Sequence, residues 1–416
     1  MSYIKKTIAA VSAAALAVSM AGCTPNIGGG SRTAETVDGY EVPAGVFIYY
    51  TVRGYNEAVS VLKENTGTDP TVKDVRNSNI DSIDSTDWIQ NKATDYAVDY
   101  VNILREFDAI GGELTQEELD EAEEMANSFY AQNPLYAENG VSIDSMIEIS
   151  EGIYKEQAIF KHYYGFDSEE GCSEDELKDY FDENYARVKY LSISLTDSEG
   201  NKVSADEERK LRALAEEYVE QINSKSSELE KLQEVEAVSQ AYSDYKAAAT
   251  TTAADAAIVT TTTTTTADAP ETTTTTTTDP YANERLVKKN TTTSADAAAA
   301  SDETVGTQAQ AEEEDEATKN ANKFNDFIFG ELELGKAEVY DYSDEAIYIV
   351  IRGDLRERMN EDGYWTDYYI TTLQSERYQE AFIEKMESKS ELLTVEKNKK
   401  AYKRYSPFKL VLEEEE

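Results

Sequence analysis

A low-complexity tract interrupts this chain of 416 residues. Between residues 247 and 316 the sequence is largely threonine, alanine and acidic residues, with unbroken threonine runs at 260–266 and 272–278. Such a tract buries too little apolar surface to offset the entropy of ordering it, so we expect it to be disordered. Only 281–289 within it has a more mixed composition. Folded domains must therefore come from the sequence on either side.

The first residues predict export and lipid attachment. Two lysines precede an apolar run at 8–18, and Ala21 and Gly22 come directly before Cys23. This order is typical of a secretory signal, and the run is shorter than the roughly 20 residues of a spanning helix. The cysteine resembles the lipobox of bacterial lipoproteins, in which it is lipidated and becomes the first mature residue. The alternative is an ordinary secreted protein whose cysteine is incidental. We expect a signal peptide, a lipid anchor at the extracytoplasmic face of the membrane and a flexible tether, at 1–22, Cys23 and 23–35.

Charge and residue usage exclude several classes of function. The formal net charge of −44 repels nucleic acid and anionic lipid, so membrane contact must come from the lipid on Cys23. Cys172 is the other cysteine, which leaves no pair for an intramolecular disulfide. His162 is the single histidine, so a multi-histidine metal site is impossible, and we expect no metal or cofactor. Its position near a predicted helix end indicates a capping or packing role.

Apolar spacing predicts a helical region over 36–170. A tight turn at Asp38-Gly39 precedes it, and glycine or proline residues separate its helices. We expect a helix after Pro43, a second capped by Thr86 or Asp87, a third with the capping box Thr115 and Glu118, and a fourth over 143–163.

Beyond residue 173 the pattern becomes mixed. Alternation along 187–195 predicts a strand, followed by a helix capped by Ser204 and Glu207 and a helix over 228–245. After the tract we expect a helix at 321–329, strands at 339–342 and 346–351, a long helix over 364–389, and short helix and extended chain over 392–412.

The order of these pieces resembles the PrsA/SurA-type extracytoplasmic foldases. Residues 36–50 resemble their N-terminal hairpin and first helix, 174–195 the helix and strand that open a parvulin domain, and 337–352 the strands that close one. Cys23 matches the lipid anchor of the Gram-positive members. In that family both chain ends build a helical chaperone lobe around an inserted parvulin domain. The resemblance implies an α+β, mostly helical fold. Its expected parts are the lobe (36–170 and 354–412), the two halves of a small α/β domain (173–246 and 317–353) and the disordered insertion (247–316).

The chain departs from that family at the prolyl site. Parvulins carry one histidine in the first strand and one in the last, where this sequence has Tyr190 and Tyr348. The two tyrosines either conserve hydrogen bonding across the core or are ordinary strand residues. We therefore expect a foldase or holdase that binds unfolded secreted polypeptides without prolyl isomerase activity.

Two other classes of function compete with this interpretation. A surface adhesion or spacer lipoprotein would use the threonine tract as a stalk, but a stalk belongs between the anchor and the domains, whereas this tract lies within them. A solute-binding lipoprotein would show the repeated strand-helix alternation of two α/β lobes, which the sequence lacks.

Overall fold

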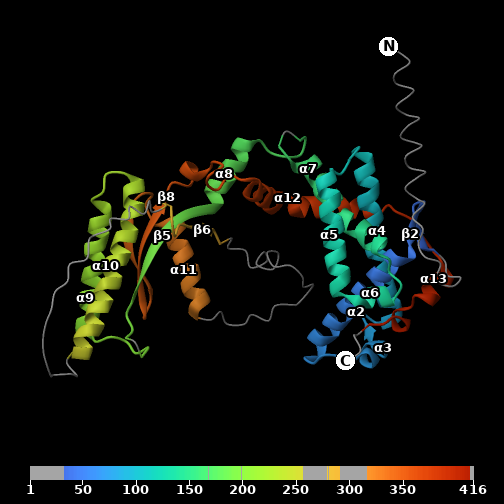
Figure 1. Cartoon of the computed structure of the whole chain (residues 1–416), viewed down its shortest axis with the longest axis horizontal. Coiled ribbons are helices and arrows are strands. Elements are labelled where there is room, and N and C mark those ends of the chain that lie inside the picture. The colour runs from blue at the N-terminus through green and yellow to red at the C-terminus, as the bar shows by residue number, and fades with distance from the viewer. Residues whose placement is uncertain are drawn as a thin grey trace, which may run out of the picture. The chain divides into compact units, whose positions relative to one another are not determined.

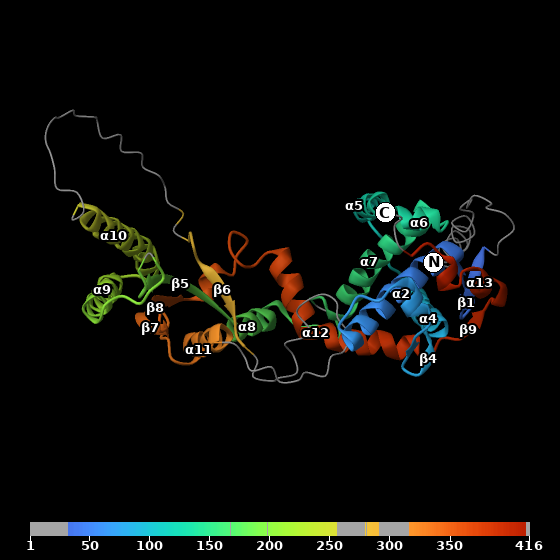
Figure 2. The ribbon, with the colours of Figure 1, turned by 90° about the horizontal axis from the view of Figure 1, so that it is seen from below.

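The computed structural model describes residues 32–166, 168–197, 199–255, 279, 281–290 and 316–412. The chain forms two compact units (Figure 1, Figure 2), the first made of Met1–Ser173 with Gln374–Glu416 and the second of Glu174–Leu373. Among the described residues helices predominate and form the units together with three small sheets, so the predicted α+β, mostly helical class is confirmed. Cys23, the signal segment 1–22 and most of 247–316 lie outside the described residues, and the predictions on them stay predictions.

The first unit draws its elements from both parts of the chain. The N-terminal part supplies β1 (Thr33–Val37), β2 (Tyr40–Pro43), α2 (Ala44–Thr66), α3 (Val72–Arg76), β3 (Asn79–Ile80), β4 (Ile83–Asp84), α4 (Ser85–Ala109), α5 (Gln116–Gln132), α6 (Pro134–Glu138) and α7 (Ile143–Tyr164). The C-terminal part supplies the second half of α12 (Asp367–Ser390), β9 (Val395–Lys397), α13 (Lys399–Arg404) and the 3₁₀ turn η3 (Pro407–Lys409).

Short sequence signals set the local structure of this unit. Asp38 and Gly39 have φ angles of 45° and 90°, the positive values that a tight two-residue hairpin turn needs between β1 and β2. Thr115 and Glu118 form the predicted capping box at the start of α5. The predicted cap of α4 is wrong. Asp84 caps this helix by accepting a hydrogen bond from Thr86 N–H, because the chain enters from β4 one residue before the helix begins.

The second half of α12 packs against α4 and α7. Phe382 and Met386 share one buried cluster with Phe107, Ile159 and Tyr164. Asn102 Nδ2 on α4 donates to the carbonyl of Met386 at 2.9 Å, and Lys389 Nζ lies 2.6 Å from Glu106 Oε2. Strand β9 adds to the same unit by pairing antiparallel with β1. The N-terminal and C-terminal segments of the chain therefore share one core.

The second unit is a four-stranded antiparallel sheet between two helical layers (Figure 1). The strand order is β6-β5-β8-β7. Ile193, Ile347, Ile349 and Ile351 face α9 and α10, while Val188 and Val350 face Phe327 and Ile328 of α11. Its elements are α8 (Glu174–Asn184), β5 (Tyr185–Ser194), α9 (Ala205–Asn223), α10 (Glu228–Asp255), β6 (Arg285–Lys288), α11 (Glu316–Gly330), β7 (Ala337–Ser343), β8 (Ala346–Gly353), the 3₁₀ turn η2 (Leu355–Arg358) and the first half of α12.

The boundaries predicted for the low-complexity tract are wrong at its edges. Helix α10 continues to Asp255 rather than ending near Tyr245, because alanine, the best helix former, dominates the residues that follow. Within the tract, Arg285–Lys288 forms β6 and pairs with β5. Asn325 on α11 holds the end of that strand, donating to Lys288 O at 2.7 Å and accepting from Asn290 N–H at 2.9 Å.

Strand β5 also carries two cations that are fully buried. Arg187 and Lys189 are 0 % and 1 % exposed on the face that α10 covers. Arg187 Nη2 lies 3.3 Å from Glu228 and its Nε lies 3.2 Å from Glu284, while Lys189 Nζ lies 3.1 Å from Glu236. Buried charges persist only when they are paired, so these contacts fix the start of α10 and the turn before β6 on the sheet.

The shared core of the first unit predicts a large effect at Phe382. This side chain is 3 % exposed, whereas its neighbour Ile383 is 45 % exposed. We expect Phe382→Ala to lower the free energy of unfolding of the first unit by about 3–5 kcal/mol, and Ile383→Ala to change it by less than about 1 kcal/mol. Urea unfolding followed by Trp88 fluorescence in a Trp365→Phe background measures it, because each unit holds one tryptophan. Equal effects of the two substitutions would contradict the packing described.

The carboxyl group of Glu35 on β1 is fully buried. It is 0 % exposed, its Oε2 accepts from Tyr402 and from Thr94 Oγ1, and its Oε1 has no hydrogen-bond partner among the described residues. Burial raises the pKa of Glu35 to about 6, although the Tyr402 hydrogen bond and the charge of Lys397 act in the opposite direction. The folded state therefore holds a proton that the unfolded state releases at lower pH.

This raised pKa predicts how stability changes with pH. Below pH ~4.5 Glu35 is protonated in both states, and above ~6 the folded state must bury its charge, so the first unit should lose about 2 kcal/mol of stability between these values. Glu35→Gln should flatten the change. Urea midpoints measured from pH 4 to 8 with the Trp88 reporter test it. Parallel pH profiles for the wild type and Glu35→Gln would assign the dependence to other groups.

Candidate functional site

Tyr190 and Tyr348, which the sequence singled out, lie side by side on the sheet of the second unit. They come from the neighbouring strands β5 and β8, where Ser192 is opposite Tyr348 and Tyr190 is opposite Val350. Even positions of both strands face α11, so the two rings meet on that face with centroids 5.0 Å apart and planes 20° apart. The contact between them is a ring stack.

Further aromatic side chains extend this pair into what we call the tyrosine face: Tyr190, Tyr340, Tyr342, Tyr348 and Phe324. Tyr342 on β7 stacks on Tyr348 with centroids 4.4 Å apart. Phe324 on α11 contacts Tyr190, Tyr340 and Tyr348 at centroid distances of 5.8, 5.2 and 5.2 Å. All five side chains are partly exposed. The five side chains therefore form an aromatic surface that remains partly accessible to solvent.

The chemistry of the tyrosine face favours binding over proton transfer. Burial, followed by the neighbouring hydroxyls of Tyr342 and Tyr190, raises the pKa of Tyr348 to about 12, so its phenol is neutral at physiological pH. The guanidinium of Arg285 on β6 lies 4.7 Å from the ring centre of Tyr190 and adds a cation on one side. Neutral phenols donate and accept hydrogen bonds and present apolar rings, which suits contact with peptide.

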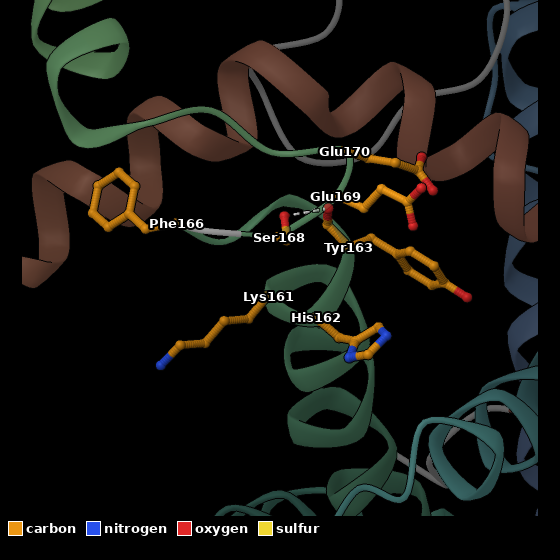
Figure 3. A pocket seen from close by; sticks show the side chains of 7 residues that line it. All are labelled: Lys161, His162, Tyr163, Phe166, Ser168, Glu169 and Glu170. Carbon is orange, nitrogen blue, oxygen red and sulfur yellow. Dashed lines mark hydrogen bonds between the residues drawn. The ribbon is translucent and has the colours of Figure 1, made fainter.

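A surface pocket in the first unit holds the single histidine (Figure 3). It lies at the end of α7 and is lined by Lys161, His162, Tyr163, Phe166, Ser168, Glu169 and Glu170. The predicted position of His162 near a helix end is confirmed. Ser168 Oγ donates to the carbonyls of Tyr163 and Gly165 at 2.6 and 2.8 Å, so this hydroxyl closes the loop after the helix rather than acting as a nucleophile.

The described residues contain no group of three or more His, Cys, Asp or Glu side chains placed to hold a metal ion. Among the same residues, no helix is both long and apolar enough to cross a membrane. No protein-family model, curated protein or solved structure matches the chain.

Sequence reasoning found two members of the tyrosine face and missed the rest. Tyr340 and Tyr342 are two residues apart, and this spacing on a strand places both on one face. That spacing could have linked them to Tyr348 across the predicted hairpin. Phe324 and Arg285 gave no such signal, because their positions depend on how α11 and β6 dock on the sheet.

Phe324 touches most of the tyrosine face, which predicts the consequence of removing it. We expect Phe324→Ala to lower the free energy of unfolding of the second unit by about 2–3 kcal/mol, through lost burial and lost ring contacts. Lys323→Ala on the exposed side of α11 is the matched control and should change it by less than about 0.5 kcal/mol. Urea unfolding followed by Trp365 fluorescence in a Trp88→Phe background measures both. An effect of Phe324→Ala no larger than the control would show that the rings are not packed as described.

Proposed function

We propose that this chain is a lipid-anchored extracytoplasmic holdase of the PrsA/SurA type that binds unfolded secreted polypeptides. Cys23 would carry the lipid at the outer face of the bacterial membrane. The observation that carries the proposal is the unit formed by both chain ends. The second half of α12 and β9 share a core with α4, α7 and β1, and a separate α/β unit lies between them in the sequence.

The second unit supports the parvulin part of the resemblance. A helix and strand, α8 and β5, open it, and the hairpin of β7 and β8 precedes its end, which is the order expected from the sequence. Tyr190 and Tyr348, at the positions where parvulins carry histidine, are in contact. A site that keeps this geometry but replaces imidazole by phenol is consistent with retained peptide binding and lost catalysis.

Carboxylates on the first unit support a preference for basic clients. Asp99 on α4 and Glu148 and Glu156 on α7 are exposed to solvent, yet the surrounding protein dehydrates them enough to raise the pKa of each. A partly dehydrated anion gains more from a nearby cation than a fully hydrated one does. The strongly acidic chain would also attract basic clients from a distance.

The spacer alternative finds less support. Both α10, whose last turns lie in the tract, and β6 within it pack on the same strand β5. A stalk separates two parts of a protein, whereas these two elements belong to one unit.

The proposed function predicts suppression of client aggregation. We expect an excess of the purified chain to reduce the light scattering of a chemically denatured client after dilution into buffer, more for a basic client than for an acidic one of similar size. Salt should narrow that difference, because it screens charge. No suppression of either client at tenfold excess (on the order of 10 µM chain) would remove the holdase proposal.

We also expect no prolyl isomerase activity. The X-Pro barrier is about 18–20 kcal/mol, and lowering it needs polar groups fixed around the twisted amide in a site closed to water. The side chains of the tyrosine face are partly exposed, and the phenol of Tyr348 is neutral at physiological pH. A protease-coupled proline-peptide assay at micromolar protein should give the uncatalysed rate. A faster rate that disappears in Tyr190→Phe or Tyr348→Phe would make these tyrosines catalytic.

A further inference from the structure

Strand β6 covers only part of the outer edge of β5. β5 pairs with β8 from Arg187 to Ser194, but with β6 only from Tyr185 to Val188. Figure 2 shows the short β6 beside the longer β5. Within the part of the chain that the structure describes, no strand lies along the rest of this edge.

Two hydrogen bonds at the strand ends show which backbone groups face that edge. Lys289 N–H donates to Asn184 O on the β6 side at 2.7 Å, and Leu195 N–H donates to Glu345 O on the β8 side, also at 2.7 Å. In an antiparallel ladder this direction alternates along the strand. Even-numbered residues of β5 therefore direct their N–H and C=O groups toward β6, and odd-numbered residues direct theirs toward β8.

Tyr190 and Ser192 are the even-numbered residues beyond the end of β6 whose backbone stays open. Ser194 N–H, the next in line, donates to the hydroxyl of Tyr242 at 3.1 Å. The backbone N–H and C=O groups of Tyr190 and Ser192 have no hydrogen-bond partner among the described residues. Ser192 is exposed to solvent. The open edge thus presents two N–H and two C=O groups at strand spacing.

The turn before β6 keeps residues 281–284 from continuing that strand along this edge. Asn283 has a φ of 61°, which breaks the extended path, and its side chain donates to Glu236 on α10 at 3.1 Å. Glu284 is 2 % exposed and lies against Arg187, and the ring of Tyr281 lies 3.7 Å from the guanidinium carbon of Arg358. These contacts hold the segment 281–284 on the α10 side of the sheet, away from Tyr190 and Ser192.

We propose that an extended segment of an unfolded polypeptide binds this edge as an added strand, antiparallel to β5 and in line with β6. The inference rests on the proposed holdase function and names its binding mode. Alternating N–H and C=O groups along an exposed edge are satisfied by another extended backbone. A peptide is therefore the occupant that fits, and its sequence matters only through its side chains.

The two faces of the sheet specify which side chains are accepted. Residues opposite Tyr190 and Ser192 would lie on the same face as these residues, next to Tyr190, the member of the tyrosine face that β5 carries. Apolar or aromatic side chains suit those positions. The residue between them, opposite Leu191, would lie on the α10 face. The edge therefore selects unfolded segments whose side chains alternate between apolar and polar, as in segments that form strands once folded.

Peptide binding to the full chain tests the proposal. The probe is a short fluorescein-labelled peptide in which valine and lysine alternate, measured by fluorescence anisotropy. A second peptide carries N-methyl groups on the valines, which removes the N–H donors that would face β5. We expect the methylated peptide to bind about tenfold more weakly or worse, since it loses two backbone hydrogen bonds.

Ser192 provides the matched protein variants. Ser192→Pro removes an N–H that points to the open edge and leaves the β8 ladder intact, so we expect it to fold and to bind the unmethylated peptide at least about tenfold more weakly. Ser192→Ala keeps the N–H and should bind as the wild type does. Trp365 fluorescence reports whether the second unit stays folded, and the methylated peptide keeps the test decisive if Ser192→Pro does not fold.

Other outcomes would overturn the inference. Equal binding of both peptides would show that the peptide binds without backbone hydrogen bonds to β5. If the wild type is a dimer that Ser192→Pro dissociates, the edge binds a second copy of this chain instead. If Ser192→Pro suppresses client aggregation as well as the wild type does, the holdase proposal stands and the edge inference fails. If the edge binds peptide but no client is protected, the holdase proposal fails instead.

Discussion

The buried guanidinium of Arg187 is the contact on which the second unit depends. It meets Glu228 at the start of α10, Glu284 before β6 and the carbonyl of Asp354 before η2, the last at 2.7 Å. These partners come from three separate segments, so one side chain ties each of them to the central strand. Burial raises the pKa of Glu284 while Arg187 and Arg358 act against that rise, so the carboxylate depends on its cationic neighbours. Removing one partner of such a set leaves an uncompensated buried charge.

Tyrosine has two roles in this chain. In the first unit Tyr50 and Tyr100 are almost fully buried near Asp99 and Glu148, and burial raises the pKa of both. On the sheet of the second unit the rings stay half exposed and stack on one another. The same side chain can pack as a core residue and present a polar tip at a surface, which lets the aromatic content of the chain serve both stability and contact.

Local signals in the sequence predicted local structure well. The turn at Asp38-Gly39 and the box of Thr115 and Glu118 depend on residues a few positions apart, and both form as predicted. The pairing of Tyr190 with Tyr348 came from a family resemblance, not from spacing. Arg187 and Lys189 could not be foreseen as buried, because alternation along a strand cannot distinguish a buried cation from a solvated one. Their partners Glu228, Glu236 and Glu284 lie far along the sequence, and only the docking of α10 and of the turn before β6 brings them close.

The closure of the first unit by its own C-terminal part has a consequence for the order of folding. Glu35 accepts one of its hydrogen bonds from Tyr402, a residue 367 positions later, and β1 pairs with β9 at a similar separation along the sequence. A chain that emerges from its N-terminus can complete the second unit before these residues appear. Until then β1, α4 and α7 lack the elements that pack against them, and Phe107 and Ile159 lack their contact partner Phe382. The growing chain therefore passes through a stage in which the second unit is folded while the first unit still lacks its C-terminal elements.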